Sequence, residues 1–287
     1  MPDWFAGNAW LALASAGLWG VGDFSGGMGV KSAGGGVGAA LRVVLLSHVT
    51  SLSVLLMVAL TVGDPFPHGR LLAWGLAAGV AGGTSLSAFY IALSRGAMGA
   101  SAAVSGVLAA AIPALVAMLS DGAPGWRKFV GFLVAGVAIW MIAAGDNAHE
   151  EASTMWLAIG AGAGFGLYFV ALKYAGAGGL IWPMATARMG SISTCALILL
   201  ALRGAGTVRI KRRVVVWVLS TALFDTSGNI IFVAATRAGR LDVAAVVASL
   251  YPASTILLAA WMMKERPTRR QWCGMAVAGV AVVLVAG

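Results

Sequence analysis

The sequence predicts an all-α membrane protein with ten transmembrane helices, arranged as two inverted five-helix repeats. Of the 287 residues, 60% are apolar and only 10% are charged, whereas soluble domains carry about 25% charged residues. Apolar runs of about 20 residues, the length that crosses a bilayer, recur along the whole chain. These runs are continuous rather than alternating, which excludes a transmembrane β-barrel.

The expected helices are separated by short segments rich in glycine, proline or charge, such as Gly-Asp-Pro at 63–65, Asp-Gly-Ala-Pro at 121–124 and the basic stretch 203–213. Such short connections predict that successive helices lie antiparallel. The ten helices are expected at residues 9–30, 37–62, 71–93, 100–119, 126–144, 152–172, 182–202, 214–235, 243–263 and 269–286.

The two halves of the chain resemble each other. A shift of 143 residues places 124–138 on 267–281, with matching Pro, Arg and Gly and an identical VAGVA run, and a shift of 146 places Arg42 on Arg188. An odd number of crossings in each half inverts the second half, and in transporters such repeats flank a binding site near the midplane. The expected repeats are residues 1–146 and 147–287.

Short motifs recur in a characteristic order: WGVGDFSGG at 19–27, ALSRG at 92–96, FDTSGNIIF at 224–232, AATRAG at 234–239, SLYPAS at 249–254 and MKERP at 263–267. Together they resemble the drug/metabolite transporter superfamily, in its ten-helix form of two EamA-like domains. The resemblance covers nearly the whole chain. Glu265 matches the end-of-helix acid of the family, whereas Asp121 is the nearest acid in the first half.

The resemblance implies a secondary transporter that exports or exchanges small metabolites, such as amino acids or related solutes, by alternating access. Two other functions fit the sequence: a multidrug/proton antiporter for organic cations, and a non-transporting membrane scaffold or sensor. No Ser/His/Asp set, zinc motif, Walker lysine loop or nucleotide fingerprint is found in the sequence. We therefore expect no enzymatic activity, no cofactor and no metal site.

Two acids, Asp23 and Asp225, lie within apolar spans, where insertion of an acid costs roughly 2.5–3.5 kcal/mol. Asn229 projects from the same helix face as Asp225, and Arg42 and Arg188 lie about six residues inside their helices. We expect each acid to pair with one arginine, and we expect protonation of the acids to be coupled to transport. Alternatively, Asn229 only bonds a neighbouring helix, and the arginines snorkel to the headgroups.

His48 is a candidate group for titration near neutral pH, with a hydrogen-bonded structural histidine as the alternative. Pro113 and Pro252 each leave a helix carbonyl without its amide partner and are candidate hinges. Glycine pairs at 22/26, 79/83 and 160/164 allow close helix approach. The aromatic side chains expected to wall a cavity, unless they only pack or anchor at the interface, are Trp19, Tyr90, Tyr168 and Tyr251.

The formal charge of +9 falls mainly in short loops, which favours anionic lipid headgroups over nucleic acid. We expect an integral protein of the bacterial inner (cytoplasmic) membrane, with the bilayer and a small-molecule substrate as partners and protons as candidate coupling ions. A homodimer is compatible with the sequence. Eleven Lys and Arg flank the spans on one side and six on the other, so the positive-inside rule predicts both termini outside the cytoplasm.

Overall fold

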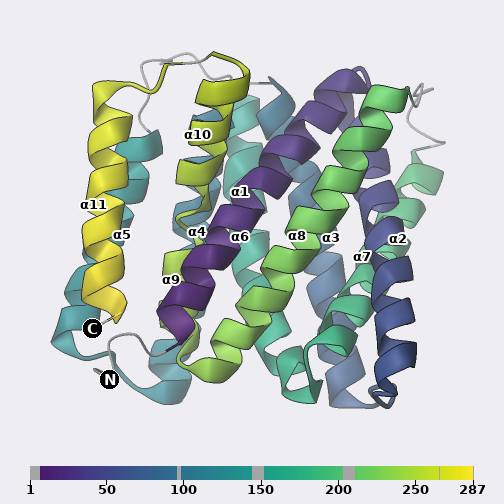
Figure 1. Cartoon of the computed structure of the whole chain (residues 1–287), viewed down its shortest axis with the longest axis horizontal. Helices are drawn as coiled ribbons and strands as arrows, with labels where there is room; N and C mark the ends of the chain where they lie inside the picture. The colour runs from purple at the N-terminus through teal and green to yellow at the C-terminus, as the bar shows by residue number, and fades with distance from the viewer. Residues whose placement is uncertain (1–6, 96–97, 144–151, 203–210, 265, 287) are drawn as a thin grey trace.

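The computed structural model describes residues 7–95, 98–143, 152–202, 211–264 and 266–286. Within these ranges the chain forms eleven α-helices, one short 3-10 helix and no strand (Figure 1), so the predicted all-α class is confirmed. In this described part of the chain, seven helical segments are long and apolar enough to cross a membrane. Glu265 and residues 203–210 of the basic stretch 203–213 lie outside the described residues.

Most helices begin and end at the segments that the sequence marks as breaks. For example, Gly63 ends the second helix with a φ of 75°, a conformation that glycine adopts without strain. The helices are α1 (Asn8–Ser32), α2 (Gly36–Val62), α3 (Arg70–Arg95), α4 (Met98–Asp121), α5 (Trp126–Ala143), α6 (Ala152–Ala175), η2 (Gly176–Gly178), α7 (Ile181–Ala201), α8 (Arg212–Ala238), α9 (Leu241–Ala248), α10 (Tyr251–Met262) and α11 (Arg269–Ala286).

The single helix predicted at 243–263 is wrong, because two helices, α9 and α10, occupy this segment. Pro252 has no amide hydrogen for the Ala248 carbonyl, and its ring crowds that carbonyl, so a regular helix does not continue through this point. Pro113, by contrast, lies inside an unbroken α4. The described residues therefore contain one α-helix more than the ten predicted.

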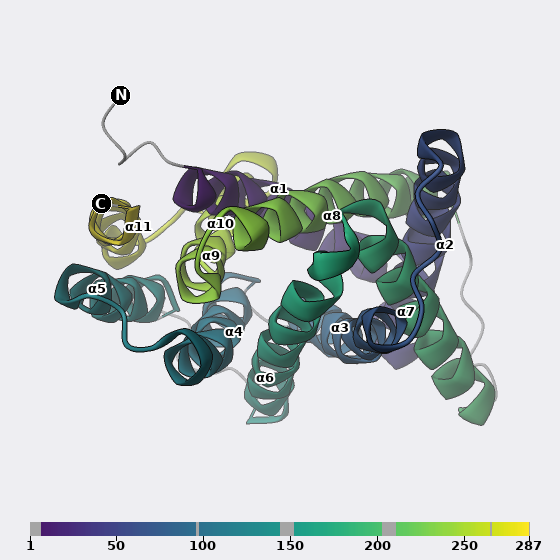
Figure 2. The same ribbon diagram turned by 90° about the horizontal axis from the view of Figure 1, so that it is seen from below.

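The helices stand side by side in a bundle (Figures 1 and 2). α1 packs along α8, α3 packs along both α6 and α7, α4 lies against α6, and α2 lies against α7. α5 and α11 pack mainly against each other at one edge of the bundle. α1 begins and α11 ends on the same side (Figure 1).

Glycines set how closely some of these helices approach. A Cβ atom on Gly22 of α1 would contact the backbone of Asp225 on α8, and a Cβ atom on Gly79 of α3 would collide with the Ala187 carbonyl on α7. The predicted close approach at these two glycines is confirmed. A Cβ atom on Gly160 of α6 would meet nothing within 4 Å, so the prediction is wrong at that position.

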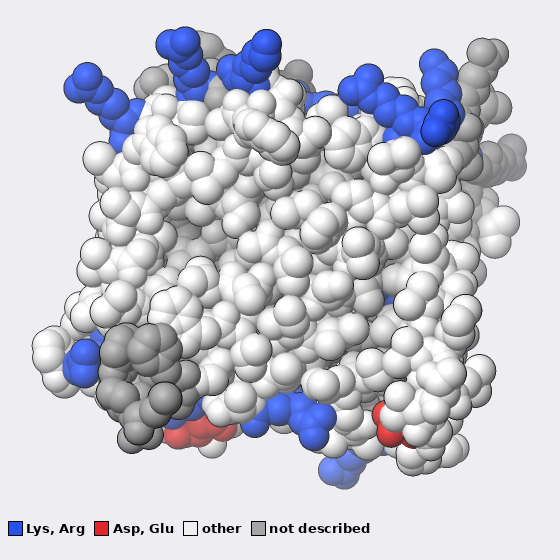
Figure 3. Space-filling model, viewed as in Figure 1, with Lys and Arg blue, Asp and Glu red and all other residues white. Residues whose placement is uncertain are grey.

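Charged side chains lie mainly along two opposite edges of the face shown in Figure 3, and the broad band between them is almost entirely uncharged. Large apolar side chains are exposed on the long apolar helices, among them Val54, Leu115 and Leu223 at 56%, 60% and 62%. Apolar surface this extensive is not stable in water but suits a bilayer. The protein is therefore an integral membrane protein.

Candidate functional site

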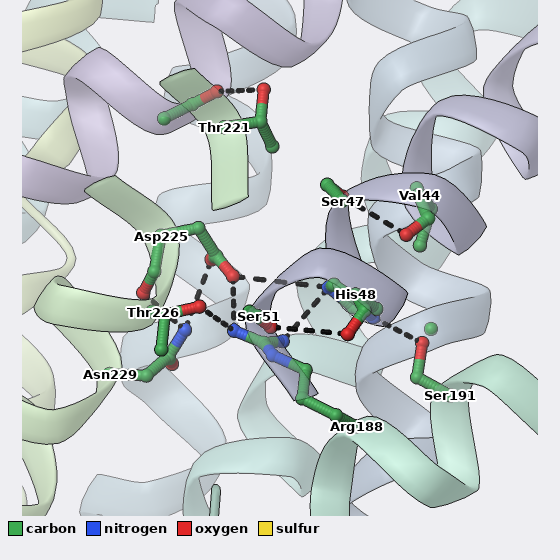
Figure 4. Close-up of polar contacts among 12 residues, drawn as sticks. Val44, Ser47, His48, Ser51, Arg188, Ser191, Thr221, Asp225, Thr226 and Asn229 are labelled. Atoms are coloured by element: carbon green, nitrogen blue, oxygen red, sulfur yellow. Dashed lines mark hydrogen bonds and ion pairs between the residues drawn. The ribbon is translucent and has the colours of Figure 1, made fainter. Parts of the chain in front are cut away.

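A cluster of buried polar side chains lies where α2, α7 and α8 meet (Figure 4). Arg188 of α7 forms an ion pair with Asp225 of α8, and its second terminal nitrogen lies 2.8 Å from Nε2 of His48 on α2. All three side chains are buried. Of the two arginines predicted to pair with acids, the structure brings Arg188 to Asp225.

The contacts of His48 define its tautomer. Arginine only donates hydrogen bonds, so Nε2 of His48 must accept from Arg188 and the ring proton must lie on Nδ1. Nδ1 then donates to the hydroxyl of Ser191 at 2.7 Å. His48 is therefore neutral here, with both ring nitrogens bonded, as in the structural alternative that the sequence leaves open.

Asn229 connects Asp225 to α6. Its amide nitrogen donates to Oδ1 of Asp225 at 3.0 Å, and its amide oxygen accepts a hydrogen bond from the Tyr168 hydroxyl at 2.6 Å. Thr226 accepts a further hydrogen bond from Arg188 at 3.2 Å. The predicted common face of Asp225 and Asn229 is confirmed, because the two side chains are in direct contact.

Two small cavities adjoin this cluster. The first has a volume of about 30 Å³ and is bordered by His48 and Arg188, and the second has about 40 Å³ and is bordered by Asp23. A buried water needs at least about 10–15 Å³ by this measure, so each cavity has room for a few water molecules. The residues that line both cavities are Leu86, Phe165, Tyr168, Asp225 and Asn229.

The second cavity has a largely aromatic wall. Five of its nine lining residues are aromatic: Trp19, Phe165, Tyr168, Phe169 and Tyr251. Trp19 stacks on Phe169 with ring centroids 5.1 Å apart and planes inclined by 3°. Three of the four aromatic residues that the sequence suggests as cavity walls therefore line this cavity together with Asp23.

The predicted pairing of Asp23 with an arginine is wrong. Within the described ranges, no hydrogen bond or ion pair reaches the Asp23 carboxyl group. Arg42 lies near the beginning of α2, where it donates to the Gly38 carbonyl at 3.1 Å. Its side chain thus bends toward the N-terminal end of α2, as in the snorkelling alternative, whereas Asp23 lies deep in α1.

The two remaining tyrosines flank Asp23 from α3 and α10. The ring of Tyr90 occupies the space beside Gly26, one turn after Asp23 on α1, and its buried hydroxyl has no hydrogen-bond partner in the described structure. The Tyr251 hydroxyl lies 2.6 Å from the hydroxyl of Ser105 on α4. Tyr90 is therefore close to the acid without lining its cavity, and Tyr251 is held by α4.

A larger groove of about 230 Å³ lies between α2 and α8. Most of its lining is apolar, including the exposed side chains of Val54 and Leu223, and Ser51 and Thr226 supply polar groups. Thr226 also accepts a hydrogen bond from Arg188. The groove therefore reaches the edge of the charged cluster.

Sequence reasoning missed Ser191 and Phe169. Ser191 follows Arg188 by one helical turn, so the spacing of three residues could have indicated a shared face. Phe169 is the position on which the shift of 146 residues places Asp23. Alignment of the repeats could therefore have indicated that an aromatic ring in the second half lies opposite the acid of the first half.

Comparison with known proteins agrees with this architecture. A solved structure, described only as a crystal structure of a protein, superposes with a TM-score of 0.73 at 14% sequence identity, covering 96% of this chain and 95% of that chain. This similarity shows a shared fold. Comparison with curated protein sequences gives no match. Residues 152–287 match the model of the EamA-like transporter family; this part of the chain is therefore an EamA-like domain, which supports membership of the drug/metabolite transporter superfamily.

Proposed function

We propose that the protein is a secondary transporter of small metabolites that works by alternating access between two inverted five-helix repeats. The observation that carries the proposal is a buried ion pair, Arg188 with Asp225, that borders two cavities in the middle of the bundle. Buried charges that face a cavity in a membrane protein typically mark a solute or ion pathway.

The packing of the helices supports the repeats. If α1 corresponds to α6 and α3 to α8, the symmetry between the repeats maps the contact of α1 with α8 onto the contact of α6 with α3. If α4 corresponds to α9 and α10, the contact of α4 with α6 is likewise mapped onto the contact of α9 and α10 with α1. Two further contacts each join a helix to its own counterpart: α2 packs against α7, and α5 packs against α11. A two-fold axis in the membrane plane produces this pattern.

The cavities lie at the interface between the proposed repeats. Their walls come from α1, α2 and α3 of the first repeat and from α6, α7, α8 and α10 of the second. Rocking of one repeat against the other would therefore open these cavities first to one side and then to the other.

We propose that protons are the coupling ions and that Asp23 carries the proton. The sequence assigns this role to both acids, but Asp225 has a permanent counter-ion in Arg188. Asp23 lacks one, and a buried unpaired carboxylate is costly. Proton binding removes that cost in one conformation, and exposure to water removes it in another.

The unequal numbers of basic residues on the two sides also support a proposed orientation, with both termini outside the cytoplasm of a bacterial inner membrane. A fluorescent protein that matures only in the cytoplasm, fused to the C-terminus, should stay dark. A bright fusion would overturn this orientation.

Counterflow in proteoliposomes tests the proposed function. Vesicles are loaded with an unlabelled amino acid, amine or nucleoside, and the same labelled solute is added outside. At least one solute should accumulate transiently with the wild type and with Asp64→Asn, which changes an exposed loop acid, but not in protein-free vesicles. A folded wild type that exchanges no member of the panel would favour the scaffold alternative.

A further inference from the structure

We propose that one anionic phospholipid binds in the groove between α2 and α8, with its phosphate near Arg42 and Arg212 and one acyl chain along the groove. The proposal concerns the outer surface of the bundle and does not depend on the proposed transport. It follows from the length of the groove, from its chemistry and from the charges at one end of it.

The groove has the length of one lipid leaflet. Its lining on α8 extends from Leu219 to Ile230, and these eleven steps along the helix rise about 16–17 Å. One leaflet is half of a hydrocarbon core of about 30 Å, so an extended acyl chain spans the same depth. Val54 and Leu223, which border the groove, are exposed apolar side chains. A lipid therefore enters the groove directly from the bilayer.

The chemistry of the groove suits an apolar occupant. Most of its lining is apolar. The Thr50 hydroxyl donates to the Leu46 carbonyl at 2.9 Å, and the Ser51 hydroxyl donates to the His48 carbonyl at 3.3 Å. Because these two hydroxyls are bonded within their own helix, an acyl chain can cover them without leaving a polar group unsatisfied.

The helices that form the two sides of the groove run in the same direction and begin at nearly the same depth in the membrane (Figure 1). A Cβ atom on Gly29 of α1 would meet Val43 of α2 at 3.3 Å and Trp217 of α8 at 3.4 Å. Val43 is the eighth residue of α2, and Trp217 is the sixth residue of α8. The two helices therefore begin at depths that differ by about 3 Å.

Arg42 and Arg212 place two positive charges at these beginnings. Arg212 is the first residue of α8, and the Arg42 guanidinium donates to the carbonyl of Gly38, the third residue of α2. Leu219 follows Arg212 by two helical turns to within about 20°, so Arg212 lies on the face that borders the groove. These turns rise about 10 Å, and the headgroup layer is roughly 5–8 Å thick. An arginine side chain spans the difference, which places both charges at the depth of the lipid phosphates.

The acids of the described ranges lie away from this end of the groove. Asp64, Asp121 and Asp242 lie at helix ends on the opposite side of the bundle, and Asp23 and Asp225 lie at its middle. Among the described residues in Figure 3, acidic side chains appear only along the lower edge, whereas basic side chains line the upper edge. In this part of the structure the charge at the beginnings of α2 and α8 is positive, and an anionic phosphate complements it.

The acyl chain would also seal the charged cluster from the bilayer side. Thr226 borders the groove and accepts a hydrogen bond from Arg188 at 3.2 Å. An empty groove would therefore give water or detergent a short path to the buried ion pair. A chain in the groove keeps this path dry and supports α8 against α2, so bound lipid should raise the thermal stability of the protein.

Native mass spectrometry of purified, delipidated full-length protein tests the proposal, because it resolves the binding of single lipids. Dioleoylphosphatidylglycerol and dioleoylphosphatidylcholine carry the same chains and differ in headgroup charge. Two arginines should make the affinity for the first phosphatidylglycerol about 30-fold higher than that for phosphatidylcholine. Equal affinities for the two lipids would overturn the anionic site. Displacement of phosphatidylglycerol by glycerol phosphate would show that a free anion binds instead of a lipid, which would also overturn the proposal.

Variants assign the lipid to this groove. Arg212→Gln should lower the affinity for phosphatidylglycerol about fivefold and leave that for phosphatidylcholine unchanged. Arg213→Gln, about 100° further round α8, should stay within about twofold of the wild type. Leu223→Trp fills the groove and should weaken both lipids at least about tenfold, since the chain loses the contacts of about two methylene groups. Leu115→Trp, at an exposed position of α4, is the matched control.

Two results would overturn the assignment. Unchanged lipid affinities in a folded Leu223→Trp protein would exclude the groove, and equal losses in Arg212→Gln and Arg213→Gln would exclude a phosphate site at Arg212. If Leu223→Trp does not fold, Val54→Trp fills the same groove from α2 and decides. None of these assays needs flux, so a failure of counterflow would leave the lipid site standing.

Discussion

Arg188 donates to Nε2 of His48 at 2.8 Å, which makes the imidazole a required acceptor for a buried guanidinium. His48→Leu should therefore lower the free energy of unfolding by about 1–3 kcal/mol, because Arg188 loses an acceptor and leucine supplies none. His48→Gln retains an acceptor oxygen and should cost less. Thermal unfolding in detergent measures the difference, and equal losses in both variants would contradict this role of His48.

Removal of one member of the Arg188 and Asp225 pair should be more costly than removal of both. Arg188→Met or Asp225→Leu leaves an unpaired buried charge, at about 3–5 kcal/mol, and should reduce the yield of folded protein. The double variant should recover much of that yield while transport stays low. Recovery of transport as well as yield would show that the pair only stabilises the fold.

The close approach of α3 and α7 predicts opposite effects for two glycine substitutions. Gly79→Ala should destabilise by about 1–3 kcal/mol, because the added Cβ meets the rigid backbone at Ala187. Gly160→Ala should be neutral or stabilising by up to about 1 kcal/mol, since its Cβ meets open space and alanine favours the helix. Similar melting temperatures for the two variants would contradict the packing of α3 on α7.

The turn before α9 depends on Arg240. Its guanidinium contacts both carboxylate oxygens of the fully buried Asp242, at 2.8 to 3.2 Å, and donates to the Gly122 carbonyl at 2.9 Å. The Asp242 hydrogen bond raises the pKa of Arg240, so the guanidinium stays charged at any physiological pH. Arg240→Leu should cost about 3–5 kcal/mol.

Arg240→Lys is the matched variant, because it keeps the charge but loses the two-pronged contact. It should melt between the wild type and Arg240→Leu. If both variants melted like the wild type, Asp242 would not depend on Arg240.

Length and composition were enough to predict the all-helical class and most helix boundaries, because apolar runs and turn residues are local signals. The break between α9 and α10 shows the limit of this reasoning. Pro252 indicated a disturbance, but Pro113, the same residue type in α4, interrupts no helix. Whether a proline ends a helix or only bends it depends on tertiary contacts that a single sequence does not contain.

The site was predictable residue by residue but not pair by pair. Polar residues in apolar spans indicated Asp23, Arg188 and Asp225, because the bilayer makes such residues costly. Equal numbers of acids and arginines suggested two pairs, yet Arg42 bonds Gly38 and Asp23 faces aromatic rings. Pairing depends on the depth and rotation of each helix, which composition does not specify.

The most direct test of the account is proton movement driven by a solute gradient in proteoliposomes. An outward-directed gradient of the solute that counterflow identifies should move protons inward in the wild type and in Asp64→Asn, reported by a trapped pH dye, and Asp23→Asn should give the signal of protein-free vesicles. Proton movement in Asp23→Asn equal to that of the wild type would contradict the central claim that Asp23 couples transport to protons.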